Sequence, residues 1–213
     1  MKSPHPSLIG PAAAVQAAAR ALISQRDRAA ILLDGDPGVG KTAVLDLLAQ
    51  DITGTPYAIE HVNGQSLSVD LVRQWRERGP YGNLFAAWTV KRIDEIDAAS
   101  SSAIAEMLSF LDYLPKGLLV MASTNEFAKL RSATKGRLES RFHRFHVDAP
   151  SVEETTMLLI RDLKVPKSIA QQIARGTVPE GCLITAGCNV RAAIRDAEAF
   201  LAARAAQKER RAA

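Results

Sequence analysis

Cysteine, aromatic residues and long apolar runs are all scarce in this chain of 213 residues. The two cysteines, Cys182 and Cys188, form no disulfide framework, and one C-x5-C pair lacks the further ligands of a zinc site, so we expect both to be packing residues. The longest apolar stretches, such as Leu118–Ala122, are far shorter than the ~20 residues that span a bilayer. The N-terminal MKSPHPSLIG contains no apolar signal segment. These absences predict a soluble, reduced protein of the cytoplasm.

The charge of the chain is nearly balanced. Lysine and arginine number 27 against 23 acidic residues, and 47% of the residues are apolar, which excludes intrinsic disorder and permits, without requiring, nucleic-acid binding. The basic residues gather in two segments: Arg131, Lys135, Arg137, Arg141 and Arg144, and then Arg204, Lys208, Arg210 and Arg211. The second segment is typical of a solvated helix end, although its charge also suits a nucleic acid.

Short apolar runs alternate with amphipathic stretches up to residue 147. Strands are expected at 29–33, 57–62, 87–93, 118–123 and 144–147, and helices at 11–25, 41–51, 68–78 and 102–114. Such alternation predicts right-handed βαβ units, and hence an α/β fold with a five-stranded, mostly parallel sheet.

The pattern changes at Pro150, after which no further strand is evident. Ser151 and Glu154 form a capping-box signature, and helices are expected at 151–162, 166–175 and 189–206. We therefore expect an α/β domain over residues 1–149 and a small helical domain with a basic tail over 150–213.

A phosphate-binding motif stands between the first expected strand and the helix that follows it. The pattern G-x4-G-K-[ST] is met by Gly35, Asp36, Pro37, Gly38, Val39, Gly40, Lys41 and Thr42, and Ala43 continues into the helix. Glycines let backbone amides surround a phosphate at a helix N-terminus. Lys41 is expected to reach the β- and γ-phosphates, and Thr42 to give its hydroxyl to Mg²⁺. The loop together with Ala43 predicts binding of a nucleoside triphosphate with Mg²⁺.

An acidic pair, Asp94 and Glu95, follows the third expected strand. One carboxylate at a strand tip can hold Mg²⁺ through water, and the adjacent one can polarise the attacking water. We assign the first role to Asp94 and the second to Glu95.

With these motifs in place, the chain resembles the AAA+ ATPases, and most of all their clamp-loader branch. Six segments carry the likeness in the family's order: Leu8-Ile9-Gly10, His61-Val62-Asn63-Gly64, Asp94-Glu95-Ile96-Asp97, Ser123-Thr124-Asn125, Ser140-Arg141-Phe142 and Gly187-Cys188-Asn189-Val190-Arg191. The resemblance implies an AAA+ core followed by a helical lid, with ATP and Mg²⁺ as cofactors.

The resemblance also implies roles for single residues. Ile9 and Gly10 are expected to pack on the adenine, and Asn125 to orient the water that Glu95 polarises. Arg191 is expected to touch the γ-phosphate from the lid. These assignments imply ATP hydrolysis that is coupled to movement of the helical domain.

Arg141 is expected to act in trans on the ATP of a neighbouring subunit, with Arg137 as a rival, so the chain is expected to form a homo-oligomer. Ordinary surface pairing for Arg141 and helix pairing for Arg191 stay open as alternatives. Asn63 either restrains Glu95 until a partner binds or simply forms a turn.

Three features depart from the clamp-loader pattern. Lys91 and Arg92 lie in a strand that is expected to be buried and apolar. The helix after Asp97 offers Ser100–Ser102 but no Lys or Arg, so little counterion release is expected from DNA there. Because the chain ends soon after the lid helices, we expect the collar domain of clamp loaders to be absent.

Three functions are compatible with these residues. The first is an oligomeric AAA+ ATPase that loads or remodels a DNA-associated complex, as clamp loaders and helicase loaders do. The second is a remodeller or chaperone that acts on a protein client without DNA, which the cation-free helix after Asp97 favours. The third, a nucleotide-gated binding module with little turnover, is disfavoured because a pure switch needs no water-activating Glu95. A client or scaffold protein is expected as a partner, and no membrane.

Overall fold

The computed structural model describes residues 8–83, 86–178 and 187–212. The chain divides into two units. The sheet unit comprises Ala14–Gly35 and Lys41–Val147, and the helical unit comprises Asp148–Ala213 together with Asp36–Gly40 and the segment up to Ala13. No helix in the described part of the chain is both long and apolar enough to cross a membrane.

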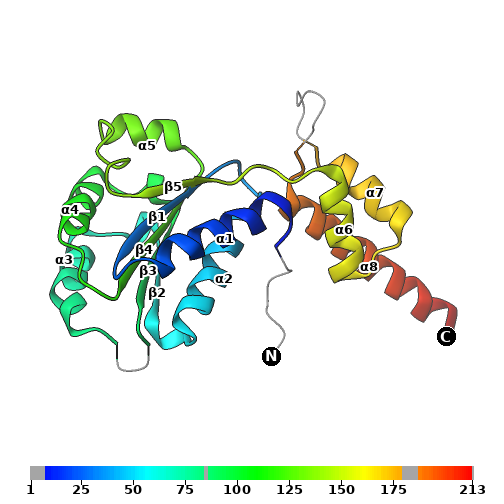
Figure 1. The fold of residues 1–213 in the computed structure, drawn as a ribbon. Coiled ribbons are helices and arrows are strands. Elements are labelled where there is room, and N and C mark those ends of the chain that lie inside the picture. The colour runs from blue at the N-terminus through cyan, green and yellow to red at the C-terminus, as the bar shows by residue number, and fades with distance from the viewer. Residues whose placement is uncertain (1–7, 84–85, 179–186, 213) are drawn as a thin grey trace. The chain divides into compact units, whose positions relative to one another are not determined.

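The sheet unit is built on five strands: β1 (Ala29–Asp34), β2 (Ile59–Asn63), β3 (Thr89–Asp94), β4 (Leu118–Thr124) and β5 (His143–His146). They lie in the order β2-β3-β4-β1-β5, and each neighbouring pair is parallel (Figure 1). β1 and β4 are buried along their whole length, which explains their uninterrupted apolar sequences. The predicted five-stranded α/β fold is therefore confirmed.

The α-helices of the described residues are α1 (Gly10–Ser24), α2 (Lys41–Thr53), α3 (Val69–Arg78), α4 (Ser101–Asp112), α5 (Phe127–Ala133), α6 (Val152–Leu163), α7 (Lys167–Gly176) and α8 (Val190–Ala212). Short 3-10 helices form at η1 (Pro56–Ala58), η2 (Gly64–Ser66), η3 (Gly79–Tyr81) and η4 (Ile96–Ala98). Every helix expected from the sequence is present, although α8 runs beyond its expected end. The sequence predicts no helix at α5, because seven residues are too few to show an apolar period.

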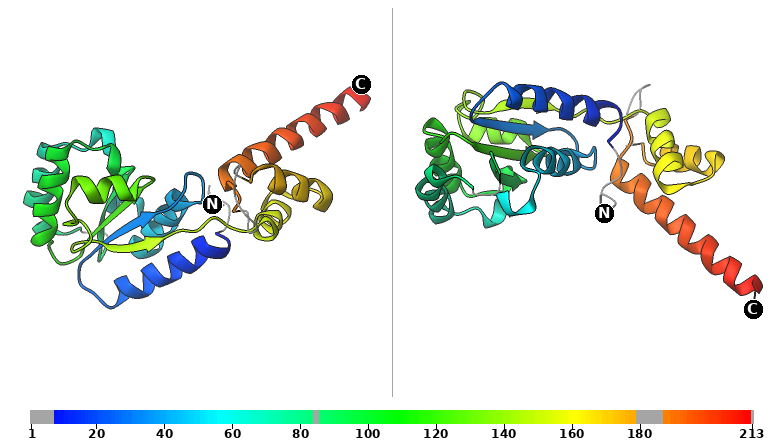
Figure 2. Two further views of the ribbon diagram at one scale, coloured as in Figure 1. Left: turned by 90° about the horizontal axis from the view of Figure 1, so that it is seen from above. Right: turned by 60° about the horizontal axis from the view of Figure 1, so that its bottom comes forward.

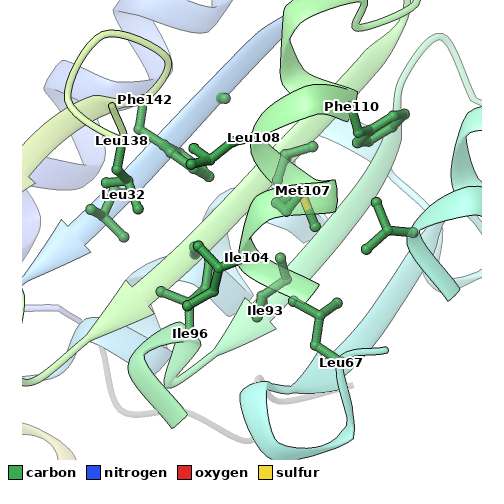
Figure 3. Packing of buried hydrophobic residues seen from close by; sticks show 14 of the residues in the cluster. Leu32, Leu67, Ile93, Ile96, Ile104, Met107, Leu108, Phe110, Leu138 and Phe142 are labelled. Atoms are coloured by element: carbon green, nitrogen blue, oxygen red, sulfur yellow. The ribbon is translucent and has the colours of Figure 1, made fainter. Parts of the chain in front are cut away.

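Helices cover both faces of the sheet, with α3 and α4 on one face and α1 and α2 on the other (Figures 1 and 2). On the first face, Met107 and Phe110 of α4 belong to the same apolar cluster as Leu32 and Ile93 of the sheet (Figure 3). Trp75 of α3 is fully buried in this cluster. Its packing helps to hold α3 against the sheet. The polar residues described below lie at the carboxyl ends of the strands.

Serine caps define where three helices begin. Ser68 Oγ accepts a hydrogen bond from Leu71 N–H at α3, and Ser100 Oγ accepts one from Ala103 N–H at α4. At α6 the capping box predicted from the sequence is present, with Ser151 Oγ accepting from the N3 amide at 3.1 Å. The carboxylate of that N3 residue accepts in turn from the Ser151 amide at 2.8 Å.

The helical unit has its own apolar cluster, to which α6, α7 and α8 contribute. Leu158 and Leu159 of α6 are buried together with Ala170 of α7 and Ala193 of α8. Ile9, which precedes α1, packs against the same cluster. The residue expected to contact adenine is therefore partly buried within the helical unit.

A buried carboxylate ties β1 to β5 just before the glycine-rich loop. Asp34 accepts hydrogen bonds from Nε and Nη2 of Arg144, each at 2.8 Å, and from Nδ1 of His146, also at 2.8 Å. The Arg144 guanidinium lies 3.7 Å from the ring centre of Phe127. Burial alone raises the pKa of Asp34, but the hydrogen bonds from Arg144 and His146 outweigh it and hold the pKa below its ordinary value.

This tie predicts a pH-dependent stability. Because the pKa of Asp34 is lower in the folded chain, its stabilising effect is complete above the ordinary value of 3.8 and is lost as the pH falls through the folded-state pKa. Asp34→Asn should lower the free energy of unfolding by about 2 kcal/mol at pH 7, because a charge-assisted pair is lost. Urea unfolding between pH 3 and 7 measures the free energy of unfolding of the unmodified chain and of the variant. The difference between the two should become smaller below about pH 4.

Asp70→Asn is the matched control, because the Asp70 side chain is 86% exposed and removal of this carboxylate from the first turn of α3 costs less than about 1 kcal/mol. If Asp34→Asn lowered the free energy of unfolding by the same amount at every pH, the result would contradict an ionised, paired Asp34.

Candidate active site

Several predicted site residues of the sheet unit lie at or just beyond the carboxyl ends of three neighbouring strands. Asp94 ends β3 and Glu95 follows it, while Asn125 follows the last residue of β4. Lys41 and Thr42 open α2, directly after the loop that leaves β1. Since β3, β4 and β1 are adjacent and parallel, these side chains share one edge of the sheet.

The loop from Gly35 to Gly40 has a backbone that only glycine adopts readily. The φ angles of Gly35, Gly38 and Gly40 are 145°, 85° and 107°. A Cβ on Gly35 would collide with the carbonyl oxygen of Val147, so this position also lacks space for a side chain. Within the loop, Asp36 and Pro37 are exposed and Val39 is buried.

Lys41 and Thr42 differ in exposure. The Lys41 side chain is buried and its Nζ donates to the Gly35 carbonyl at 2.7 Å, which holds the ammonium group at the start of the loop. Thr42 is exposed in the first turn of α2, and Ala43 is partly buried. The Thr42 hydroxyl and the Asp94 carboxylate are hard oxygen donors of the kind that Mg²⁺ prefers, so these residues fit the expected ion.

Glu95 has a strained backbone and an available carboxylate. Its φ and ψ are 54° and 55°, a left-handed conformation that costs a non-glycine residue of the order of 1 kcal/mol. Its amide donates to Ser123 Oγ at 3.3 Å, and the Gly64 backbone lies so close to the Glu95 carbonyl that a Cβ there would collide with it. Among the described residues the exposed Glu95 side chain has no hydrogen-bond partner.

The two asparagines that the sequence analysis named, Asn63 and Asn125, differ in their side-chain hydrogen bonds. Asn63 Oδ1 accepts from the Gln65 amide at 3.0 Å, so the structure uses this residue in the turn that starts η2. Asn125 is exposed, and its side chain has no hydrogen-bond partner among the described residues. It follows the fully buried Thr124, which fixes its position at the end of β4.

Lys91 points to the α3 face of the sheet and has partners there. Its Nζ donates to Glu60 at 2.5 Å and lies 5.5 Å from the ring centre of Trp75, whose Nε1 also donates to Glu60, at 2.8 Å. Burial raises the pKa of Glu60, but the hydrogen bonds from Lys91 and Trp75 hold it below its ordinary value. This buried cation, unexplained by the sequence, is thus neutralised by a carboxylate on the neighbouring strand.

Arg92 points to the opposite face, where α2 lies. Its guanidinium contacts Asp46 of α2 and also binds Asp94, with Nε at 3.1 Å from one carboxylate oxygen and Nη2 at 2.8 Å from the other. His61 Nε2 lies 3.0 Å from the second of these oxygens. Asp46 was missed in the sequence, and His61 was named only as part of the segment His61-Val62-Asn63-Gly64, because nothing local marks either residue as a partner of β3.

Arg141 is held within its own unit. Its Nε and Nη2 bind the two carboxylate oxygens of Asp112 at 2.8 and 3.0 Å, and 25% of its side chain is exposed. Arg137 is more open: its Nε donates to the Thr134 carbonyl at 3.3 Å, and no described carboxylate pairs with it. The pair with Asp112 is the kind of surface contact that the sequence left open as an alternative role for Arg141.

The first basic segment is largely neutralised by acidic side chains. Arg131 pairs with Glu139 and Arg144 with Asp34, in addition to the pair made by Arg141. The hydroxyl of Ser100, a candidate phosphate contact, is occupied as the cap of α4. In the C-terminal tail, Arg204 and Arg210 are exposed on α8, as expected for a solvated helix end.

One predicted residue of the helical unit, Arg191, contacts the glycine-rich loop through its backbone. Arg191 is exposed at the start of α8, and its amide donates to the Gly38 carbonyl at 3.3 Å. Asn189 Oδ1 caps this helix by accepting from the Ala192 amide at 3.0 Å. Gly10 begins α1 with a φ of 46°.

Of the two cysteines, Cys188 is buried, and its Sγ donates to the Ala174 carbonyl at 3.2 Å, as expected for a packing residue. Cys182 lies outside the described residues.

Comparisons with known proteins agree with this geometry. The chain is similar in structure to a DNA polymerase III gamma subunit-related protein from Thermotoga maritima, with a TM-score of 0.56 and 17% sequence identity. The likeness covers 74% of this chain but 57% of that protein, and at this identity it shows the fold alone. No curated protein matched the sequence. The sequence model of the "ATPase family associated with various cellular activities (AAA)" matches residues 31–145, more than half of the chain. The chain therefore belongs to the AAA family of ATPases.

Proposed function

We propose that the chain is a Mg²⁺-dependent ATPase that hydrolyses ATP between subunits and uses the energy to load or remodel a DNA-associated complex. One observation carries this proposal: Glu95 and Asn125, both exposed and without a side-chain partner among the described residues, follow adjacent strands beside the helix that begins with Lys41. A base and a water-orienting amide are the groups that hydrolysis needs in addition to a phosphate cradle.

Each of these residues has a separate task. The amides of residues 35–43 and the Lys41 ammonium bind the phosphates, and Thr42 and Asp94 hold Mg²⁺, which neutralises phosphate charge when bound. Glu95 takes a proton from the attacking water, and Asn125 orients that water. Glu95 has a left-handed backbone and is exposed to solvent, as a base that acts on water requires.

Assembly supplies the remaining groups. Arg141 reaches the ATP of a neighbouring subunit, for which it exchanges its pair with Asp112, and Arg191 contacts the γ-phosphate from the helical domain over residues 150–213. Ile9 and Gly10 contribute to adenine binding. An arginine supplied in trans is worth roughly 10³–10⁵ in rate in well-studied NTPases, so an isolated subunit turns over slowly.

A protein client without DNA is the second candidate, and α4 favours it. This helix contains no Lys or Arg, its Glu106 pairs with Arg76 of α3 and its Asp112 pairs with Arg141. A surface with these charges gains nothing from contact with DNA phosphates. If DNA is bound, other cations bind it, such as the exposed Arg137.

The phosphate loop and the base are tested by two substitutions. Lys41→Ala should weaken ATP binding by about 100-fold, since charge-assisted bonds worth about 3 kcal/mol are lost. Glu95→Gln should keep ATP affinity within about threefold and lower turnover by roughly 10²–10⁴, the usual contribution of a general base. Calorimetric ATP binding and steady-state phosphate release measure the two effects.

Glu126→Gln is the matched control for the base, because Glu126 is an exposed carboxylate one residue beyond Asn125 and pairs with Lys129. Its turnover should equal that of the unmodified chain. Normal turnover in Glu95→Gln would show that Glu95 is not the base.

The residue that acts in trans is tested by mixing variants. Arg141→Ala subunits keep an intact ATP site, and Lys41→Ala subunits keep Arg141, so a mixed interface is complete where the two meet. Turnover of the mixture should exceed the sum of the separate activities, with a maximum at intermediate ratios. The same experiment with Arg137→Ala should give no comparable recovery, because that variant retains Arg141 and is active by itself.

Absence of recovery with Arg141→Ala at every ratio would remove Arg141 from this role. Inactive Arg137→Ala subunits that recover on mixing would assign the role to Arg137 instead.

A further inference from the structure

We propose that Arg92, tied to Asp46 of α2, is a positioning residue that sets the Asp94 carboxylate for Mg²⁺. This inference rests on the proposed function, since it gives Asp94 and Thr42 their metal role. It assigns a purpose to a cation in the middle of β3, where a buried parallel strand is ordinarily apolar.

The contacts of Arg92 are extensive and buried. Its side chain is 6% exposed, and its guanidinium contacts Asp46 on one side and both oxygens of Asp94 on the other. The side chains of Asp46 and Asp94 are 19% and 15% exposed. A side-on arginine–carboxylate pair fixes the plane of the carboxylate as well as its distance, which a point charge does not do.

This arrangement links the two elements that carry the metal ligands. Asp46 lies on α2, the helix that begins with Lys41 and Thr42, while Asp94 ends β3. A single guanidinium therefore joins the helix that supplies the hydroxyl to the strand that supplies the carboxylate. Residues that orient metal ligands in this way commonly change metal affinity by 10–100-fold when they are replaced.

Arg92 also balances the negative charges of its two partners. It is the shared cation of two partly buried carboxylates, Asp46 and Asp94, and it offsets the repulsion between their negative charges. A carboxylate has about four lone-pair sites, so the pair with Arg92 still leaves Asp94 an acceptor for a metal-bound water.

His61 contributes less than Arg92. Its side chain is 51% exposed and makes one contact, at 3.0 Å, with one oxygen of Asp94. A half-exposed side chain with a single contact is easily displaced, whereas Arg92 is fixed from both sides. Replacement of His61 is therefore a control for replacement of Arg92, because both residues contact Asp94.

The test compares ATP binding by the full chain in EDTA and in excess Mg²⁺, by calorimetry. The ratio of the two affinities is the Mg²⁺ effect. Arg92→Lys keeps the charge and loses the side-on geometry, so its Mg²⁺ effect should fall by about tenfold or more while its affinity in EDTA stays within about twofold. A purely structural role would lower the unfolding temperature without changing this ratio.

Three further variants make the result specific. Asp46→Asn keeps Arg92 but loosens its tie to α2, so the Mg²⁺ effect should fall in this variant also, which keeps the proposal testable if Arg92→Lys does not fold. Lys91→Arg disturbs the adjacent position of β3 on the opposite face, and His61→Gln removes the exposed contact. Both should leave the Mg²⁺ effect within about twofold, because neither changes the side-on pair.

An unchanged Mg²⁺ effect in folded Arg92→Lys or Asp46→Asn overturns the inference. An increased effect also overturns it, since Arg92 would then compete with the metal for Asp94. If the unmodified chain binds ATP no better than Lys41→Ala, the proposed function itself fails; if it binds ATP normally and only the Arg92 result is negative, the proposed function stands.

Discussion

Parallel pairing of β3, β4 and β1 is the constraint on which the candidate active site depends. Because the three strands are adjacent and run in one direction, the residues that follow their carboxyl ends meet at one edge of the sheet. Lys41, Glu95 and Asn125 reach this edge from segments that are widely separated in sequence. The apolar cluster beneath α3 and α4 keeps the strands in register, so packing far from the chemistry determines the geometry of the site.

Charged residues inside the sheet form a second layer of organisation. Lys91 with Glu60, Arg92 with Asp46 and Asp94, and Arg144 with Asp34 each join a strand to a neighbouring strand or helix. Removing one partner of such a pair leaves the other charge buried and poorly solvated. These contacts therefore specify which elements lie together more than they add to net stability. Two of the three pairs lie at the strand ends that adjoin the glycine-rich loop or the acidic pair.

Much of the fold was predictable because its signals are local. Apolar runs gave the strands, the glycine-rich motif placed the loop, and Ser151 with Glu154 marked the start of α6. The partners of Lys91, Arg92 and Arg141 were not predictable, since Glu60, Asp46 and Asp112 are brought close only by folding. Asp34 could have been suspected, because a carboxylate at the end of a buried strand needs a cation.

ATP hydrolysis at an interface between subunits is best tested by measuring turnover per subunit across a wide range of protein concentration. Turnover should rise with concentration as interfaces form, because Arg141 is then supplied to the ATP of a neighbour. A further rise with primed DNA would support a DNA-associated client, and stimulation by a protein alone would support the second candidate. Turnover per subunit that stays constant over the whole range would contradict a shared active site.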